Sequence, residues 1–178
     1  MAGYFVATVI YKKAINFQKN IITMADNNTT NYVKIILKHY AFGEEGFERL
    51  WATKVQNGYQ LDNIPFYAKN YSLNDIVSIE NLNGDFFVRS LVQESGHSTI
   101  RVLFKNVAIV QEIRENLKAR GCSSELSNLP NLIALDIPTD VSYSELRKYL
   151  DAGELNHQWE YQEACISSYH KAKMNNQK

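Results

Sequence analysis

The sequence predicts an α+β protein in which a small antiparallel β-barrel or curled sheet is followed by a second unit of strands and helices. Up to residue 93, short β-branched and aromatic runs are separated by tight turns. Beyond residue 95, the apolar spacing alternates between the strand and helix periods, in the order β-α-β-β-α-β. This order is typical of a ferredoxin-like unit, and the spacing of the earlier strands is typical of an SH3-like barrel.

The first half contains predicted strands that share β-branched or aromatic content. They are residues 31–40, 48–56, 59–67, 75–81 and 85–93. The Asn-Gly pairs at 57–58 and 83–84 are the strongest hairpin signals. We expect Gly43 and Gly46 to break the chain between the first two strands. Pro65 cannot donate to a strand ladder, so the third segment is expected to end there or to lie at an edge.

The second half combines four short strands with two helices. The predicted strands are residues 98–104, 122–127, 132–137 and 158–166. Helical spacing covers 107–119 after an Asn106 cap, and Ser142 with Glu145 forms a capping box for a helix that Gly153 is expected to end. Right-handed crossovers place both helices on one face of the sheet and leave the other face to the barrel, solvent or a partner.

The predicted organisation has four segments in chain order. They are an N-terminal extension at 1–30, a barrel-like subdomain at 31–94, a ferredoxin-like subdomain at 95–168 and a polar tail at 169–178 that we expect to fray. Met24 opens a polar run, so we interpret residues 1–23 as an upstream extension of the native chain. The alternative is an ordered N-terminal strand.

The composition is ordinary for a globular protein, with 45% hydrophobic and 21% charged residues among 178. The net formal charge is zero, which argues against general electrostatic attraction to nucleic acid or anionic lipid. Cys122 and Cys165 lack metal-ligand spacing and are predicted to be free thiols, with a disulfide left open. The chain has no Walker, zincin or nucleophile-elbow motif, so we expect no metal and no cofactor.

Residues 95–104 form the first candidate surface. A glycine-containing polar turn leads into a strand whose apolar residues alternate with His97, Thr99 and Arg101. With Ser98, these side chains could form a ligand or partner surface on which His97 acts as an acid or base and Arg101 holds an oxyanion. Alternatively, the polar groups satisfy the turn, and Arg101 pairs with an acid across the interface between the subdomains.

Asp62 and Asn63 open the second candidate, a segment that ends at Phe66. It could line a ligand site, or form a turn held by Asx hydrogen bonds with Phe66 filling the barrel. Asp62 or Asp75 could also orient the imidazole of His97. Six aromatic residues could stack nucleobases but are mostly expected in the core: Trp51, Tyr59, Phe66, Tyr67, Phe86 and Phe87.

Four sequence motifs occur in a fixed order along the chain. They are Leu50-Trp51-Ala52, Leu61-Asp62-Asn63-Ile64-Pro65-Phe66, Asp75-Ile76-Val77 and Ser95-Gly96-His97-Ser98-Thr99-Ile100-Arg101-Val102. Over roughly residues 32–166, the chain resembles the bacterial family catalogued as domain of unknown function 4265. The resemblance implies kinship and a bacterial cytoplasmic origin but no activity, because the family has none assigned.

The absence of catalytic motifs favours a bacterial cytoplasmic binding protein, of an immunity or regulatory type, that occludes a protein partner. The stretch 136–163, with seven acids against two basic residues, could occupy a basic partner's site or could be a solvated face. One alternative is a small-molecule-binding enzyme or hydrolase that uses His97 and Arg101 at the seam between the subdomains. Another is a nucleic-acid-associated barrel. We expect no membrane association, because no apolar run has the length of a membrane span.

Overall fold

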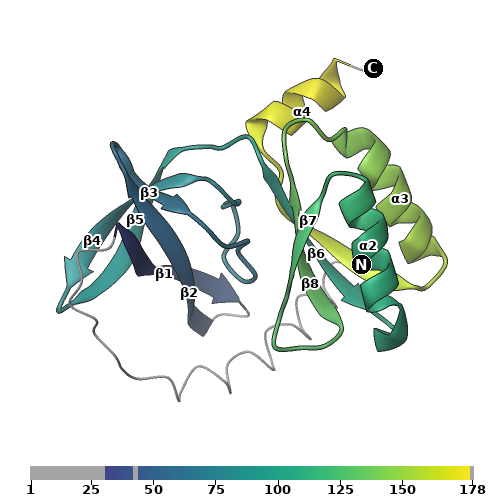
Figure 1. Cartoon of the computed structure of the whole chain (residues 1–178), viewed down its shortest axis with the longest axis horizontal. Helices are drawn as coiled ribbons and strands as arrows, with labels where there is room; N and C mark the ends of the chain where they lie inside the picture. Colours follow the sequence, from purple (N-terminus) through teal and green to yellow (C-terminus); the bar gives the residue numbers. More distant parts are fainter. Residues whose placement is uncertain (1–30, 42–43, 177–178) are drawn as a thin grey trace.

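The computed structural model describes residues 31–41 and 44–176 as two units that lie side by side (Figure 1). One is a closed barrel, and the other is a four-stranded sheet with helices on the face away from the barrel. The protein is therefore α+β, as the sequence predicts. The expectations for residues 1–30 lie outside the described residues.

The barrel is built from the five strands of the first half. They are β1 (Tyr32–Ala41), β2 (Glu44–Val55), β3 (Gly58–Leu61), β4 (Ile76–Leu82) and β5 (Asp85–Gln93). Neighbouring strands pair antiparallel, and a short parallel contact of Ile35 and Ile36 with β5 closes the barrel. Alternate residues of β1 and β2, among them Ile35 and Leu50, point inward and form its apolar core.

Gly46 does not break the chain as predicted but lies within β2, directly opposite His39 of β1. A Cβ on Gly46 would overlap the His39 ring. The glycine therefore serves the packing of an aromatic ring across two strands, and the strand pairing continues through it.

The second unit contains β6 (Ser98–Phe104), β7 (Ser123–Leu126), β8 (Leu132–Ile137) and β9 (Trp159–Cys165) in the antiparallel order β7-β8-β6-β9. Both α2 (Val110–Ala119) and α3 (Tyr143–Leu155) cover the face away from the barrel (Figure 1). The core between sheet and helices is continuous and includes Ile100, Val102, Leu117, Leu146 and Trp159. No helix among the described residues is long and apolar enough to cross a membrane.

The helix boundaries differ from the prediction at several points. The Asn106 side chain caps the short 3-10 turn η2 (Val107–Ile109) that precedes α2. Ser142 does stand at the N-cap of α3, but its hydroxyl contacts Ser144, so the predicted capping box is wrong. Gly153 does not end α3, which continues to Leu155. The glycine instead makes room for the Trp159 ring, which packs directly on it.

The predicted frayed tail is instead a helix, α4 (Ser168–Asn175). Ser167 caps it, accepting the amide hydrogen of His170. Glu94 accepts hydrogen bonds from the amide and hydroxyl of Ser168, so α4 is fastened to the segment that joins the two units. Cys122 and Cys165 are free thiols, which answers the open disulfide question.

Candidate functional site

The seam is the contact between the barrel and the sheet face that carries Thr99 and Arg101. Ser98, Thr99 and Arg101 are completely buried there or beneath α4, so this part of the first candidate surface is covered by the chain itself. The covering segment is the β3–β4 loop, residues 62–75, which packs over β6. These three side chains therefore bind other parts of the same molecule.

Arg101 is bonded to both units. Its Nη2 donates to the Ala68 carbonyl at 2.9 Å, and its Nη1 donates to Oε1 of Gln162 at 2.9 Å. The Ala68 amide in turn donates to buried Glu48 at 3.0 Å, and Glu48 also accepts the amides of Phe66 and Tyr67. The peptide of Ala68 therefore links the guanidinium to a carboxylate of the other unit without direct contact.

Burial raises the pKa of Glu48, and the three amides and the positive charge of Arg101 oppose that shift. A buried carboxylate is costly unless its lone pairs accept hydrogen bonds. Glu48 therefore holds the β3–β4 loop in place through these three amides. Both Glu48 and Arg101 are buried and inaccessible to a substrate.

Asp75 joins the loop to the start of the second unit. Its carboxylate accepts the amides of Ser72 and Ser95, each at 2.8 Å. Ser72 in turn accepts a hydrogen bond from Thr99 at 3.1 Å. Asp75 is fully occupied by these bonds and does not orient His97, contrary to one of the options in the sequence analysis.

His97 lies at the edge of the seam and is oriented by Asp136, whose Oδ1 is 2.8 Å from Nδ1. The side chain of His97 is 18% exposed, and that of Asp136 is 4% exposed. Burial raises the pKa of Asp136, and the contact with His97 opposes that shift. Sequence reasoning missed Asp136, although it is the one charged residue in the otherwise apolar strand β8.

Ser98 belongs to a buried cluster under α4. Its hydroxyl lies 2.7 Å from Nδ1 of His170 and accepts the Ser167 amide at 3.0 Å. The Ser167 hydroxyl donates to the carbonyl of Gly96, which has a left-handed φ of 86°. Because Ser98 is buried on every side, the cluster anchors α4 and offers no accessible nucleophile.

Asp62 and Asn63 position two aromatic side chains on the barrel exterior. Asp62 accepts the hydroxyl of Tyr32 at 2.7 Å, and the Asn63 side chain accepts the Trp51 amide at 2.9 Å. Phe66 does not fill the barrel as expected, since it packs against Leu103 and Leu132 at the seam. Asn63 also donates to the Glu125 carboxylate of β7 at 3.4 Å, and the Ile64 amide donates to it at 3.0 Å. Both the polar start and the apolar end of this segment therefore contact the second unit, while Asp62 faces outward.

We define the hairpin face as the outer face of the β1–β2 pair. In antiparallel strands, directly opposite residues share a face. The register therefore groups the residues Tyr32, Lys34, Ile36, Lys38, Tyr40, Glu45, Phe47, Arg49, Trp51 and Thr53. Four large aromatic side chains of this set are exposed, by 38% for Trp51 and Phe47, 40% for Tyr32 and 65% for Tyr40.

Of the six aromatic residues singled out in the sequence, Trp51 belongs to this face. Tyr59 and Phe86 pack against the barrel core, and Phe66 and Tyr67 lie at the seam. Phe87 of β5 makes an edge contact with Phe47 at 6.1 Å between ring centroids. Sequence reasoning missed three residues of this face, Tyr32, Tyr40 and Phe47. The two-residue alternation of the strands could have indicated that these side chains share one face.

The acidic stretch of the second unit is largely engaged within the molecule. Lys105 pairs with Glu160, Lys148 pairs with Glu145, and Arg147 lies between Asp151 and Glu163. These contacts lower the negative potential that a basic partner would meet. Among the described residues, no group of three His, Cys, Asp or Glu side chains is arranged to hold a metal ion.

A family model described as "Domain of unknown function (DUF4265)" matches residues 48–161, which is more than half of the chain. A comparison with curated proteins finds no match. A solved structure described as a hypothetical protein from Neisseria gonorrhoeae has a similar fold, with a TM-score of 0.70 and 21% sequence identity. The similarity covers 80% of this chain and 99% of that one, so it extends over both units of this chain.

Proposed function

The chain belongs to the DUF4265 family, and we propose from this premise that it is a non-catalytic binding protein that occludes a protein partner with its hairpin face. The observation that carries the proposal is the gathering of exposed Trp51, Phe47, Tyr32 and Tyr40 on that face. Aromatic and arginine side chains dominate the binding energy of protein interfaces, and Arg49 lies among these rings.

The central ring of this face is held in place before any partner arrives. Trp51 stacks on Tyr32 with 4.7 Å between centroids and 6° between planes, and the Lys34 ammonium lies 4.8 Å from its centroid. Asn63 fixes the backbone of Trp51, and Asp62 fixes the hydroxyl of Tyr32. A rigid aromatic anchor loses little conformational entropy on binding, which favours a recognition role.

The strand edges also favour binding of a partner to the hairpin face, because they offer little room for an added strand. The barrel is closed, and the outer strands of the sheet are bonded to the chain's own groups. Arg114 donates to the Ser124 carbonyl in β7 at 3.0 Å, and the Asn70 amide donates to the Ala164 carbonyl in β9 at 3.2 Å. Such contacts discourage a partner from adding a strand, so a face is the more accessible surface.

A nucleic-acid role receives less support from the hairpin face. Two of its three basic residues, Lys38 and Arg49, are paired with Glu45 and Asp85, and the third, Lys34, lies over the Trp51 ring. A nucleobase stacking on Trp51 would compete with the contacts that already hold this ring. A salt-sensitive mobility shift with single-stranded DNA or RNA would reverse this ranking.

His97 supports a second candidate, acid–base chemistry. An acid on Nδ1, here Asp136 at 2.8 Å, is the arrangement that orients a histidine so that Nε2 can exchange a proton with a substrate. The Arg101 part of this alternative is not supported, because Arg101 is buried under the β3–β4 loop. Turnover of a generic ester or phosphoester that disappears in His97→Gln and persists in Trp51→Ser would favour the enzyme.

We also propose the finer assignments of fold and origin. The order β7-β8-β6-β9 with two helices on one face supports a ferredoxin-like unit, and the small five-stranded barrel supports an SH3-like one. The seam contacts and the change of pattern near residue 95 support subdomains at 31–94 and 95–168, with α4 added to the second. A bacterial cytoplasmic origin is supported by the family resemblance.

The test captures partners from an extract of the encoding organism with full-length protein and compares two matched variants. Trp51→Ser with Phe47→Ser alters the hairpin face, and Leu82→Ser with Leu155→Ser removes exposed apolar side chains elsewhere. We expect one partner to be lost at least about tenfold from the first variant and retained by the second. Equal capture by both variants, or no partner for the native sequence, contradicts the proposal. A toxin gene beside the coding sequence would specify the immunity type.

A further inference from the structure

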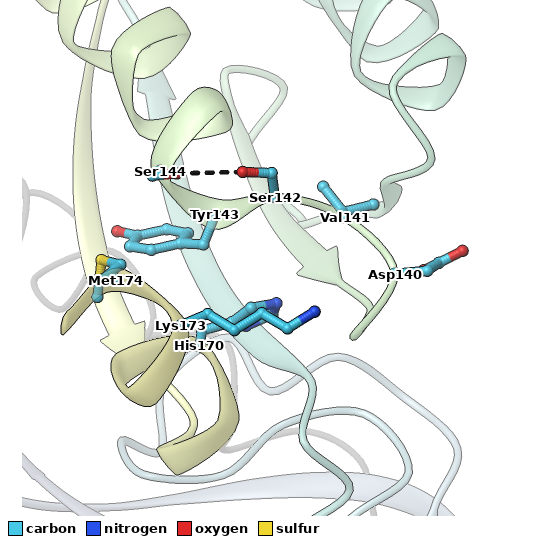
Figure 2. A pocket seen from close by; sticks show the side chains of 8 residues that line it. All are labelled: Asp140, Val141, Ser142, Tyr143, Ser144, His170, Lys173 and Met174. Carbon is cyan, nitrogen blue, oxygen red and sulfur yellow. Dashed lines mark hydrogen bonds between the residues drawn. The ribbon is translucent and has the colours of Figure 1, made fainter. Parts of the chain in front are cut away.

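A pocket between the start of α3 and α4 is too small to be the main binding surface of the molecule (Figure 2). Its volume is about 140 Å³, whereas sites for drug-sized ligands have roughly 300–1,000 Å³. His170, which lines one side of it, is 1% exposed and lies by the carbonyl groups of Val141 and Pro138. The buried polar group of this pocket is therefore engaged within the chain.

The hairpin face, by contrast, continues onto a third strand of the barrel. Phe87 of β5 pairs with Ile36 of β1 in the strand register and meets the Phe47 ring edge-on. Ile36 is 3% exposed and lies between Phe87 and the opposite residue of β2, Arg49. Contiguous apolar areas of this kind on a protein surface commonly mark an interaction site.

Carboxylates neutralise two of the three basic residues of the hairpin face. Glu45 pairs with Lys38 at one end of the face. Asp85 of β5 lies 3.4 Å from Arg49 near its centre. A strongly acidic or strongly basic partner would have to displace these pairs, whereas a partner with the same near balance of charge would not. A second copy of the chain has that balance.

The register of β1 and β2 places a basic residue opposite an aromatic one at two positions. Lys34 is directly opposite Trp51, and Lys38 is directly opposite Phe47. A two-fold axis parallel to the strands, between β1 and β2, would lay β1 of one copy over β2 of the other. Lys34 of each copy would then lie over Trp51 of the other. An ammonium group over an aromatic ring is stabilising, and more so when both are removed from water.

The other two-fold axis, which runs across the strands, is disfavoured by charge. It would lay β1 of one copy over β1 of the other in the opposite direction, so that Lys34 would face Lys38. Like charges that face each other destabilise an interface. Because the strands of two packed sheets run within about 30° of each other, these two axes are the relevant choices, and the register favours the parallel one.

We propose that two copies of the chain bind each other weakly through their hairpin faces, about an axis parallel to β1 and β2. The ten outward residues of the hairpin face cover about 300 Å², from a strand spacing of about 4.8 Å and about 6.6 Å between outward residues. A stable interface buries about 800 Å² on each partner, so the Kd should be on the order of 100 μM. The dimer goes beyond the function proposed above and would compete with the partner of that complex for the same face.

The test is sedimentation velocity of the full chain over a concentration series up to about 500 μM. The average mass of the native sequence should rise with concentration above the 20.5 kDa of one chain. Trp51→Ser should weaken association at least about tenfold, as for a central aromatic anchor. Circular dichroism of each variant verifies its fold.

Two exposed lysines of the hairpin provide the matched charge variants. Lys34→Glu should weaken association about tenfold, because it places an anion over the ring of the other copy. Lys54→Glu makes the same change at an exposed residue of β2 that is outside the hairpin face, and should leave association unchanged.

Three results would overturn the proposal. They are a native chain that stays monomeric, equal weakening by Lys34→Glu and Lys54→Glu, and stronger association of Lys34→Glu, which would indicate the axis across the strands. A monomeric chain that still captures a different protein through Trp51 and Phe47 would remove the dimer alone. A dimer without such a capture would support the dimer and contradict the function proposed above.

Discussion

Replacing Gly153 with alanine should destabilise the protein, although alanine is the better helix former. A Cβ at this position of α3 would lie 1.8 Å from Cζ2 of Trp159, and ordinary contacts begin near 3.4 Å. The indole must therefore move by about 1.6 Å. Trp159 is 2% exposed and is packed against Phe104 and Tyr149, so it has little room to retreat.

The size of the effect follows from three contributions. Overpacking a filled core costs about 1–3 kcal/mol. The displacement also breaks the 3.1 Å hydrogen bond from the indole nitrogen of Trp159 to the Leu150 carbonyl and leaves a buried donor, at a cost of about 1–3 kcal/mol. The gain in helix propensity returns about 1 kcal/mol. The expected net loss is about 3 kcal/mol in the free energy of unfolding.

Urea denaturation followed by far-UV circular dichroism measures this loss without depending on tryptophan fluorescence. Ala152→Gly, at an exposed neighbour in the same helix, isolates propensity and should cost about 1 kcal/mol. In a Trp159→Phe background the overlapping ring atoms are gone, so Gly153→Ala should become nearly neutral. A stabilising Gly153→Ala, or an equal loss in both backgrounds, would refute the argument.

Three further predictions follow from buried groups. Glu48→Gln should lose about 1–3 kcal/mol, because an amide donor would face the backbone amides that the carboxylate now accepts; urea titration should show no comparable loss for exposed Glu80→Gln. Burial lowers the pKa of His170, so stability should be complete above about pH 6.5 and fall as the pH drops below it. Thermal scans from pH 5 to 8 should show a shallower fall in His170→Asn, and an unchanged slope would exclude this role. Gly46→Ala should lower the melting temperature through its overlap with His39, and an unchanged melting temperature would contradict that packing.

The strands were predictable because their signals are local. Alternation and turn residues define β5, β6 and β8 within the same residues that the structure assigns to them. The predictions for Gly46 and Gly153 were wrong because the role of a glycine depends on what packs against it. Gly46 meets His39 across a strand pair, and Gly153 meets Trp159 across the core. Neither contact leaves a local sign in the sequence.

The candidate site was only partly predictable for a related reason. One of the alternatives pairs Arg101 with an acid across the interface, and the structure interposes one peptide between Arg101 and Glu48. The helix α4 was missed because its composition is polar and its anchor, His170, binds Ser98 far back in the chain. The hairpin face could have been found, because Phe47, Arg49 and Trp51 alternate with the buried residues of β2.

The peptide of Ala68 makes the two units interdependent. If the chain were cut near residue 95, the second piece would expose Arg101 and Thr99 on a sheet face built to be dry, and the first piece would carry a loop whose carbonyl had lost its donor. We therefore expect the two units to unfold together and neither half to fold on its own. A single calorimetric transition for residues 31–176, and insoluble or unfolded halves, is the expected signature; two independent transitions would show that the seam contributes little.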